Sequence, residues 1–270
     1  MKNLLRHEQR FTRALDHLCR HYQCDSDLHR LAEEAHLSPW HWHRLYHQLM
    51  GETPHATQRW MRLHRAAWLL GNSDKSIADI ARECGYGGNA QSFARIFRGL
   101  YGLTPHQYRQ QNRPVSYPVE IVTLPDIALI ALEHRGDYQR LGDSYAKLEA
   151  ILRLRGQMPD APRIFSLQYC DPATTSEEEL RACIAVAGKP RRIEPPLIRE
   201  HIRGGRYAVL RHCGPAAEID HAYHWLEEIW LPQSGFTMRD DRPSINEYLT
   251  YARDTSPREQ RSDLHIPLMD

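Results

Sequence analysis

The stretch SIADIARECGYGGNAQSFARIFRGLYGLTP, residues 76–105, determines how the first half of the chain folds. Apolar residues recur in it at helical spacing over Ile77–Tyr86 and again over about Ala90–Tyr101. Ser76, with Asp79 three residues later, has the spacing of a helix N-cap. The stretch therefore predicts two amphipathic helices joined by a short turn.

The same arrangement occurs 49 residues earlier. Leu28–Leu37 repeats the apolar spacing of the first predicted helix, and a second predicted helix, Pro39–Met50, follows it after Ser38. In both copies the second helix is followed by Gly-x-Thr-Pro-His. Between the copies, Ala56–Leu70 lacks glycine and proline and predicts a rigid linking helix. The sequence thus contains a helix-turn-helix pattern twice.

The balance of charge changes at the proline-flanked segment 114–118. Residues 1–113 contain 16 Lys and Arg against 10 Asp and Glu, whereas the remainder contains 19 against 24. A basic part joined to an acidic part suggests that only the first meets a polyanion. Of the 35 basic residues 31 are arginine, which binds phosphate and guanine bidentately, although a GC-rich genome would also favour arginine codons. We expect an all-α domain 1–113 with helix-turn-helix units at about 26–51 and 76–102, a linker 114–118, and a second domain 119–270.

Composition excludes several classes of protein. The longest apolar run, Ile127–Leu132, is too short to cross a membrane, and the first eleven residues lack the hydrophobic region of a secretory signal. The six cysteines show no C-x-x-C spacing, which argues against a zinc ribbon and for reduced thiols. We therefore expect a cytoplasmic protein without a membrane partner.

Three segments of the first domain, Ile80–Tyr86, Phe93–Phe97 and Tyr101–Arg109, resemble the signature of AraC/XylS-family transcription regulators. The resemblance implies two helix-turn-helix units in successive major-groove segments of double-stranded DNA, joined by the long helix. One chain would then bind an asymmetric promoter site about two helical turns long. An activator of this kind implies RNA polymerase as a further partner.

The resemblance also implies which residues read the DNA. Trp40, His43 and Arg44 match base-contacting positions in the first unit, and arginine to guanine is the commonest specific contact. A core position is the alternative for Trp40. In the second unit the candidates are Asn89, Gln91, Ser92 and Arg95. The turn before them is one residue longer than the family pattern, through Gly87-Gly88, so the start of that helix and base contact by Asn89 stay open.

Histidines four residues apart on a helix are a competing signal for metal binding. His43 and His47 have this spacing, as do His17 and His21. No carboxylate or cysteine falls at a matching ligand spacing around either pair. We therefore expect neither a metal nor another cofactor.

The second half contains a repeat of its own. Leu132-x-His134-x-Gly136 recurs 78 residues later as Leu210-x-His212-x-Gly214, and the same offset pairs Tyr145 with Tyr223 and Leu148 with Leu226. Strands are predicted at Val119–Val122, Ile127–Leu132, Ile164–Tyr169, Ala182–Val186, Tyr207–Arg211 and Ile245–Tyr248, and helices at Leu141–Arg155 and Glu218–Ile229. We expect an α+β domain of two duplicated halves, with one sheet, helices on one side, and a ligand cleft at the pseudo-symmetry axis.

This half resembles the GyrI-like effector-binding domain. The matching segments are His134–Tyr138, Tyr169–Pro172, Gly204–Val209, His212–Pro215 and His265–Leu268. An AraC-type domain followed by a GyrI-like domain is the order of Rob-type regulators. The resemblance implies an aromatic-lined cleft for cationic or amphipathic molecules, with a buried glutamate as counter-charge.

The position of that glutamate is where the chain departs from the family. The family pattern Glu-x-Tyr-Leu reads Asn246-Glu247-Tyr248-Leu249 here. Regular alternation would place Asn246 beside Tyr248 and favour neutral, hydrogen-bonding ligands, whereas a bulge would bring Glu247 into the cleft. The candidate ligand residues are Tyr138, Tyr145, Tyr169, Trp225, Asn246, Glu247 and Tyr248, although any of the aromatic ones has a core position as its alternative.

Three functions are compared on this basis. The first is a DNA-binding transcription regulator, an activator, whose second domain senses a small amphipathic or xenobiotic molecule. The second is a hydrolase of small electrophiles, because some GyrI-like domains have that activity; Glu247 with Tyr248 or Tyr145 would have to activate water. No G-x-S-x-G, H-E-x-x-H or P-loop motif supports catalysis, so we expect no enzyme. The third is a DNA-binding protein whose second domain docks a protein partner.

Overall fold

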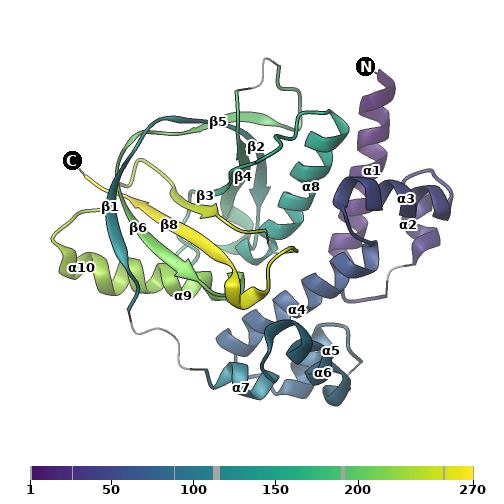
Figure 1. Cartoon of the computed structure of the whole chain (residues 1–270), viewed down its shortest axis with the longest axis horizontal. Coiled ribbons are helices and arrows are strands. Elements are labelled where there is room, and N and C mark those ends of the chain that lie inside the picture. Colours follow the sequence, from purple (N-terminus) through teal and green to yellow (C-terminus); the bar gives the residue numbers. More distant parts are fainter. Residues whose placement is uncertain are drawn as a thin grey trace. The chain divides into compact units, whose positions relative to one another are not determined.

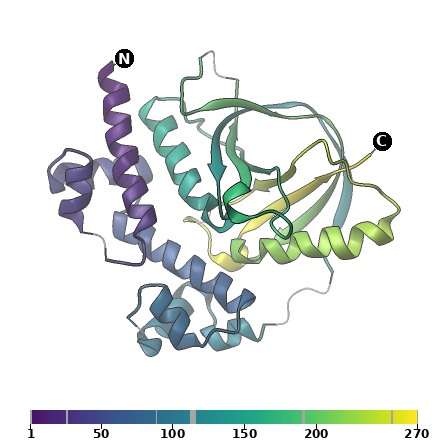
Figure 2. The ribbon, with the colours of Figure 1, turned by 180° about the vertical axis from the view of Figure 1, so that it is seen from behind.

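The structure, a computed structural model, describes residues 2–25, 27–87, 89–111, 116–189, 192–251 and 253–269 (Figures 1 and 2). It divides into a helical unit, Met1–Gln111 with Glu149–Met158, and a sheet unit, Asn112–Leu148 with Pro159–Asp270. Positions 114 and 115 of the expected linker lie outside the described residues. Within the described residues, none of the helices has the length and apolar character needed to cross a membrane.

The helical unit contains the two predicted helix-turn-helix pairs (Figure 1). Its helices are α1 (Lys2–Arg20), α2 (Leu28–Glu34), α3 (Pro39–Met50), α4 (Pro54–Asn72), α5 (Ile77–Glu83), α6 (Ala90–Tyr101) and α7 (Pro105–Arg109). Helices α2 and α3 form the first pair, α5 and α6 form the second, and α4 links them. The expected all-α first half is confirmed.

The local sequence sets the ends of α3 and α6. The side chains of Ser38 and Asn89 each accept a hydrogen bond from a backbone N–H in the first turn, of 3.4 Å and 3.0 Å. Both helices end at a glycine in the left-handed conformation, Gly51 (φ 72°) and Gly102 (φ 70°). A residue with a Cβ would be strained there, so the repeated glycine fixes where each helix stops.

A buried arginine of α4 connects the second helix pair to the loop between α1 and α2. Arg62 is 8% exposed; its Nε donates to the Tyr22 carbonyl (2.6 Å) and its terminal nitrogens donate to Asp25 (3.2 Å). Gly85, in the turn after α5, has φ 79°, and a Cβ there would lie 2.0 Å from the Gln23 carbonyl oxygen. Because loop, guanidinium and turn meet at one point, only glycine fits at position 85.

This close approach predicts different outcomes for two alanine substitutions. Gly85→Ala and Gly87→Ala both place a Cβ on left-handed backbone, which costs about 1–2 kcal/mol. At Gly87 no atom lies within 4 Å of the new Cβ, whereas at Gly85 the loop must also move. Urea denaturation should therefore show a clearly larger loss of stability for Gly85→Ala. Equal losses would mean that the close approach does not constrain the fold.

The sheet unit is built on one eight-stranded sheet in the order β1-β6-β8-β7-β3-β4-β2-β5. Its strands are β1 (Val119–Leu124), β2 (Ile127–Arg135), β3 (Ile164–Gln168), β4 (Arg181–Ala187), β5 (Ile198–Ile202), β6 (Gly205–Cys213), β7 (Ser244–Tyr248) and β8 (Arg261–Pro267). Its helical segments are η1 (Tyr138–Arg140), α8 (Leu141–Leu154), η2 (Glu177–Glu179), η3 (Ala216–Glu218), α9 (Ile219–His224), the π-helical η4 (Trp225–Trp230), α10 (Leu231–Ser234) and η5 (Pro257–Glu259); the end of α8 is assigned to the helical unit. The predicted α+β architecture is confirmed.

Two long segments of the chain, β1 with β2 and β5 with β6, cross in the sheet unit. The chain passes from β1 to β2 through Pro125 and Asp126, and from β5 to β6 through Arg203 and Gly204. Strand β1 pairs with β6, and β2 pairs with β5, so the two long segments run antiparallel through the crossing. There the Gly204 N–H donates to the Asp126 carboxylate (2.7 Å). The crossing joins the two duplicated halves.

The pseudo-symmetry axis also passes between β3 and β7. Ile164 pairs with Tyr248 and Gln168 pairs with Ser244, which places Ser166 opposite Asn246 at the centre. The pairing continues without interruption on the other side of β7, against β8. The strand therefore has no bulge, and its side chains alternate regularly between the two faces.

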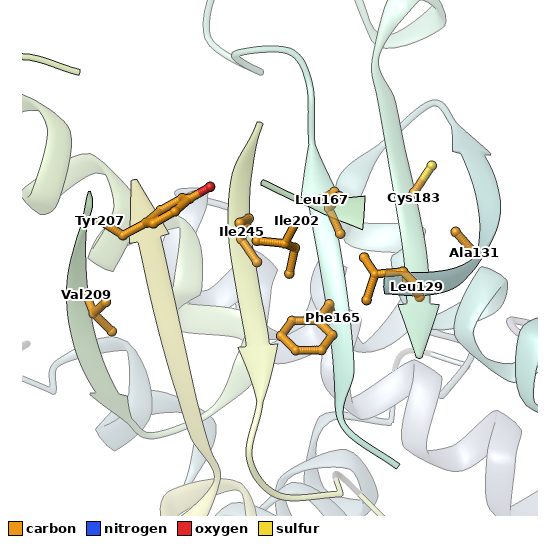
Figure 3. Close-up of a cluster of buried hydrophobic side chains, with 10 residues drawn as sticks. Leu129, Ala131, Phe165, Leu167, Cys183, Ile202, Tyr207, Val209 and Ile245 are labelled. Atoms are coloured by element: carbon orange, nitrogen blue, oxygen red, sulfur yellow. The ribbon is translucent and has the colours of Figure 1, made fainter. Parts of the chain in front are cut away.

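The two faces of the sheet differ. The face opposite the helices carries an apolar cluster that includes Phe165, Tyr207 and Ile245 (Figure 3). On the other face Ala208, Leu210 and Leu264 pack against α9 and η4, which run along the sheet with α10 (Figure 2). Ser144 of α8 bonds to His134 of β2 at 2.8 Å. Helices on one side of the sheet were expected, and the structure confirms them.

Candidate functional site

The first turn of α3 presents an exposed aromatic and cationic pair. Trp40 is 64% exposed, and the Arg44 guanidinium lies over its ring, 4.4 Å from the centroid. His43 is exposed as well, whereas Trp42 and Tyr46 are buried on the opposite side of the helix. Trp40 is thus not a core residue. The helix separates a core side from a polar and aromatic side.

Helix α6 has the same two-sided arrangement. Gln91 and Arg95 are exposed one turn apart, and Phe93 and Phe97 are buried behind them. Asn89 is exposed but accepts the capping hydrogen bond from the Ser92 N–H (3.0 Å), and Ser92 is half-buried. The helix therefore begins at Ala90; Gly88 of the preceding turn lies outside the described residues.

The paired histidines of the helical unit lie in two different settings. His17 and His21 stack with ring centroids 4.3 Å apart, and His43 and His47 are exposed on α3. Within the described part of the chain, no group of three or more His, Cys, Asp or Glu side chains is arranged to hold a metal ion.

The helix-side centre of the sheet holds a set of polar groups, which we call the axial cluster: the buried Ser166, Tyr223, Ser244 and Asn246 and the half-buried Tyr248. Asn246 is 1% exposed, and neither atom of its amide has a hydrogen bond of standard geometry within the described chain. The buried hydroxyl of Tyr223 likewise has none. Tyr248 bonds weakly to Ser166 (3.4 Å); burial raises its pKa, and Ser166 and Asn246 act in the opposite direction. Buried polar groups without partners are rare and mark a place where a ligand can supply them.

One acidic residue beside the axial cluster was not among the sequence candidates. Glu227 lies in η4 and forms a hydrogen bond with Ser244. Burial raises the pKa of Glu227 to about 7, and Asp171 and Glu228 act in the same direction. The offset of 78 pairs it with Glu149, which is buried but bonded to Arg153 at 2.8 Å. The internal repeat of the sequence could therefore have identified Glu227 as a candidate, because it pairs with a second glutamate.

Regular alternation separates the other candidates on β7. Asn246 and Tyr248 face the helices, whereas Glu247 faces the opposite side and pairs with Arg163 (2.8 Å). Tyr169 also lies away from the axial cluster, and its hydroxyl donates to Glu200 (3.1 Å). The two positions that a hydrolytic pair would need, Glu247 and Tyr248, are thus on different faces.

The remaining candidates take structural positions. The Tyr138 hydroxyl donates to the carbonyl of Arg181 (2.7 Å). Trp225 packs edge to face against Tyr117, with centroids 5.3 Å apart. Tyr145 lies on α8 with its hydroxyl buried.

A separate cavity of about 240 Å³, lined by residues that include Tyr169, Glu200, Tyr207 and Arg242, lies between β5 and the segment before β7.

Comparison with known proteins places this architecture in a family. Residues 117–269 match the model of the GyrI-like small molecule binding domain, which is more than half of the chain. The chain belongs to the GyrI-like family. Residues 31–111 of this GyrI-like protein match a helix-turn-helix domain.

Two curated relatives are similar to different extents. The probable transcriptional regulator YgiV of Escherichia coli K12 is 31% identical over 153 residues, which cover 56% of this chain and 95% of YgiV. The regulatory protein PocR of Salmonella typhimurium is 34% identical over 112 residues, covering 42% of this chain and 37% of PocR. Among solved structures, the C-terminal domain of EcmrR is 15% identical; 57% of this chain and 98% of that chain are covered, with a TM-score of 0.47.

The two domains together define the class of the protein. An AraC-type helix-turn-helix domain joined to a GyrI-like small-molecule binding domain makes the chain a DNA-binding transcription regulator, as the sequence predicted.

The unpartnered amide of Asn246 predicts an unusual effect on stability. Asn246→Leu replaces two buried polar atoms that lack hydrogen bonds with an apolar group of similar size and leaves no cavity, so the free energy of unfolding should rise by about 1 kcal/mol. The matched control is Ser166→Ala, opposite it on β3, which removes a hydroxyl that does bond to Tyr248 and should lower stability. Denaturant titration measures both; a loss of stability on Asn246→Leu would show that the amide is satisfied in solution.

Proposed function

We propose that this GyrI-like regulator is a transcription activator that reads an asymmetric duplex site about two helical turns long with α3 and α6. The observation that carries the proposal is the exposed Trp40–Arg44 stack at the start of α3. In helix-turn-helix proteins the N-terminal residues of the second helix contact base edges. RNA polymerase is the further partner that activation requires.

The chemistry of the exposed side chains supports specific contacts. Arg44 can bond bidentately to guanine O6 and N7, and Gln91 to adenine N6 and N7. The Trp40 ring lies against the Arg44 guanidinium and offers an apolar surface to a thymine methyl group. Asn89 is engaged in capping, so His43 and Arg95 are the better candidates for the remaining contacts to bases or phosphates.

The effector part of the proposal rests on the axial cluster. Asn246, Tyr223 and Tyr248 are polar groups set in an apolar surrounding, which suits an amphipathic small molecule. A hydrolase is less well supported, because Glu247 is paired with Arg163 on the opposite face. A docking function for the sheet unit remains as the second candidate, and ligand-induced thermal stabilisation distinguishes the two.

Substitution of Arg44 tests the reading surface. Arg44→Ala should weaken binding to the preferred duplex by about 1–3 kcal/mol and relax the preference at one base pair. Selection from a randomised duplex pool identifies the preferred site, and titration at several salt concentrations measures the affinity. The control is Arg135→Ala, an exposed arginine of the sheet unit, which should change neither quantity. An unchanged base preference in Arg44→Ala would refute the proposal that α3 reads the DNA through Arg44.

A pair of tyrosine variants tests the location of the effector. Tyr248→Phe should reduce the rise in Tm produced by the best members of a panel of cationic and neutral aromatic amphiphiles, without changing DNA affinity. The control is Tyr169→Phe, which removes a tyrosine hydroxyl on the face of the sheet opposite the helices. It should leave the rise in Tm intact. The reverse outcome would place the effector in the cavity beside Tyr169, and no rise for any compound would favour the docking function.

A further inference from the structure

Helices α3 and α6 carry a basic side chain at the same place in their last turn. Both helices are twelve residues long, and each ends at a left-handed glycine whose N–H donates to the carbonyl four residues earlier. That carbonyl belongs to His47 in α3 (2.9 Å) and to Arg98 in α6 (2.8 Å). An offset of 51 residues therefore aligns the two helices position by position. It pairs Arg44 with Arg95. In the last turn it pairs His47 with Arg98.

His47 and Arg98 lie on the exposed side of their helices. Each follows the exposed arginine of its helix by three residues, so the two basic side chains share one face. His47 also follows Trp40 by seven residues, which is about two helical turns along the same face. Within the described residues neither side chain forms a hydrogen bond or an ion pair, so both are available to a ligand.

The place of these two side chains along the helix fits the sugar–phosphate backbone of DNA. The N-terminal residues of a reading helix contact base edges, whereas its C-terminal end can contact the backbone, as it does in homeodomains. Phosphate oxygens accept a large share of all hydrogen bonds from proteins to DNA. We propose that His47 and Arg98 are equivalent phosphate contacts, and that the contact made by His47 exists only when its imidazole is protonated. This proposal rests on the proposed reading of the duplex by α3 and α6.

The two helices differ in when their basic side chains are charged. A guanidinium group stays protonated throughout the physiological pH range, whereas imidazole is the side chain that titrates between pH 5 and 8. Helix α3 also exposes His41 and His43, and α6 contains no histidine. A phosphate beside an imidazole favours its protonated form, so DNA binding by α3 should take up protons. DNA binding by α6 should not.

The groups around α3 leave His43 and His47 without an anionic partner in the described part of the chain. Helix α3 contains neither aspartate nor glutamate. The Glu52 carboxylate, in the loop after α3, accepts a hydrogen bond from Thr57 (2.7 Å), and Glu34 of α2 lies 3.9 Å from His17 of α1. The other charged or titratable side chains of the neighbouring elements include Glu8 and Asp16 of α1, His29, Arg30 and Glu33 of α2, His36 of the turn before α3, and His55, Arg59, Arg62, His64 and Arg65 of α4. None of them forms a hydrogen bond or an ion pair with either histidine within the described residues.

His41 differs from the other two histidines of α3. Its Nδ1 lies 2.9 Å from the hydroxyl of Ser38, the residue that caps the helix, and its ring lies beside that of Trp40 with centroids 5.1 Å apart. His41 is therefore engaged at the start of α3. The proton-dependent contact is assigned to His47, because His47 alone occupies the position that is an arginine in α6.

This difference between the helices predicts that affinity for the preferred duplex falls as the pH rises from 6 to 8. The loss of one proton-dependent contact should weaken binding by about three- to tenfold over this interval. The slope of log affinity against log salt concentration should become shallower by about one, because one phosphate fewer is neutralised. The contacts of α6 should be the same at both pH values.

The test exchanges the side chains between the two helices. The full chain is titrated with the fluorescently labelled preferred duplex at pH 6, 7 and 8 and at several salt concentrations. His47→Arg should bind at pH 8 as tightly as the wild-type protein does at pH 6, and its affinity should no longer depend on pH. Arg98→His should add a second pH-dependent contact and deepen the fall by a further factor of about three to ten. The matched control is His224→Gln, which changes an exposed histidine of the sheet unit and should behave like the wild-type protein.

Three results would overturn the proposal. An affinity independent of pH in the wild-type protein, with Arg44→Ala still relaxing the base preference, would leave reading by α3 in place and remove the proton-dependent contact. A pH dependence that persists in His47→Arg and disappears in His43→Gln would assign the contact to His43. No effect of Arg44→Ala, His47→Arg or Arg98→His on DNA binding would remove the reading surface itself. An unchanged Tm of each variant shows that it has folded.

Discussion

The fold of the sheet unit depends on the point where the long segment β1–β2 crosses the long segment β5–β6. At Gly204 the backbone between β5 and β6 lies against the backbone between β1 and β2. A Cβ at this position would be 3.0 Å from the Leu124 carbonyl oxygen. The Gly204 N–H is satisfied by Asp126, so the close contact leaves no unpaired donor. Each long segment therefore contributes a strand to both halves of the sheet: β1 and β6 lie in one half, and β2 and β5 lie in the other. The axial cluster lies at the centre of the fold because the duplicated halves meet along the same axis.

The two halves of the repeat differ in whether their polar groups beside the axis have partners. Ser166 and Asn246 occupy the central pair of strand positions, yet only the hydroxyl has a partner. Glu149 has an arginine four residues later, and Glu227 does not. A cationic partner offsets the free energy of removing a carboxylate from water, and no cation is among the groups that act on the partly exposed Glu227. The polar groups that lack a partner thus belong to the second half, and the equivalent groups of the first half have one.

Much of the fold could be predicted from sequence because its signals are local. The serine caps, the Gly-x-Thr-Pro turns and the 3.6-residue periodicity predict α3 and place α6 to within its first turn. Strands β5 and β8 were missed for a physical reason. Strand β5 lies at the sheet edge with charged residues between its apolar ends, and β8 buries Ser262, Asp263 and His265 in place of an apolar alternation.

The candidate site was predictable only in part. Alternation places Asn246 beside Tyr248, but the sequence left a bulge open, and only the uninterrupted pairing with β3 and β8 decides between the two. The position of Glu227 depends on a π-helical turn, which periodicity does not predict. The exposure of Trp40 follows from the packing of Trp42 and Tyr46 against Phe11, a contact between distant segments.

The duplication has an evolutionary consequence for the axial cluster. In a symmetric dimer every substitution appears on both sides of the axis, so a favourable contact on one side brings an obligatory copy on the other. When the two halves are fused in one chain, each side of the axis mutates independently. A protein of this construction can adapt to a lopsided molecule, with a charge at one end and a ring at the other, by changing one half and leaving the scaffold of its twin untouched.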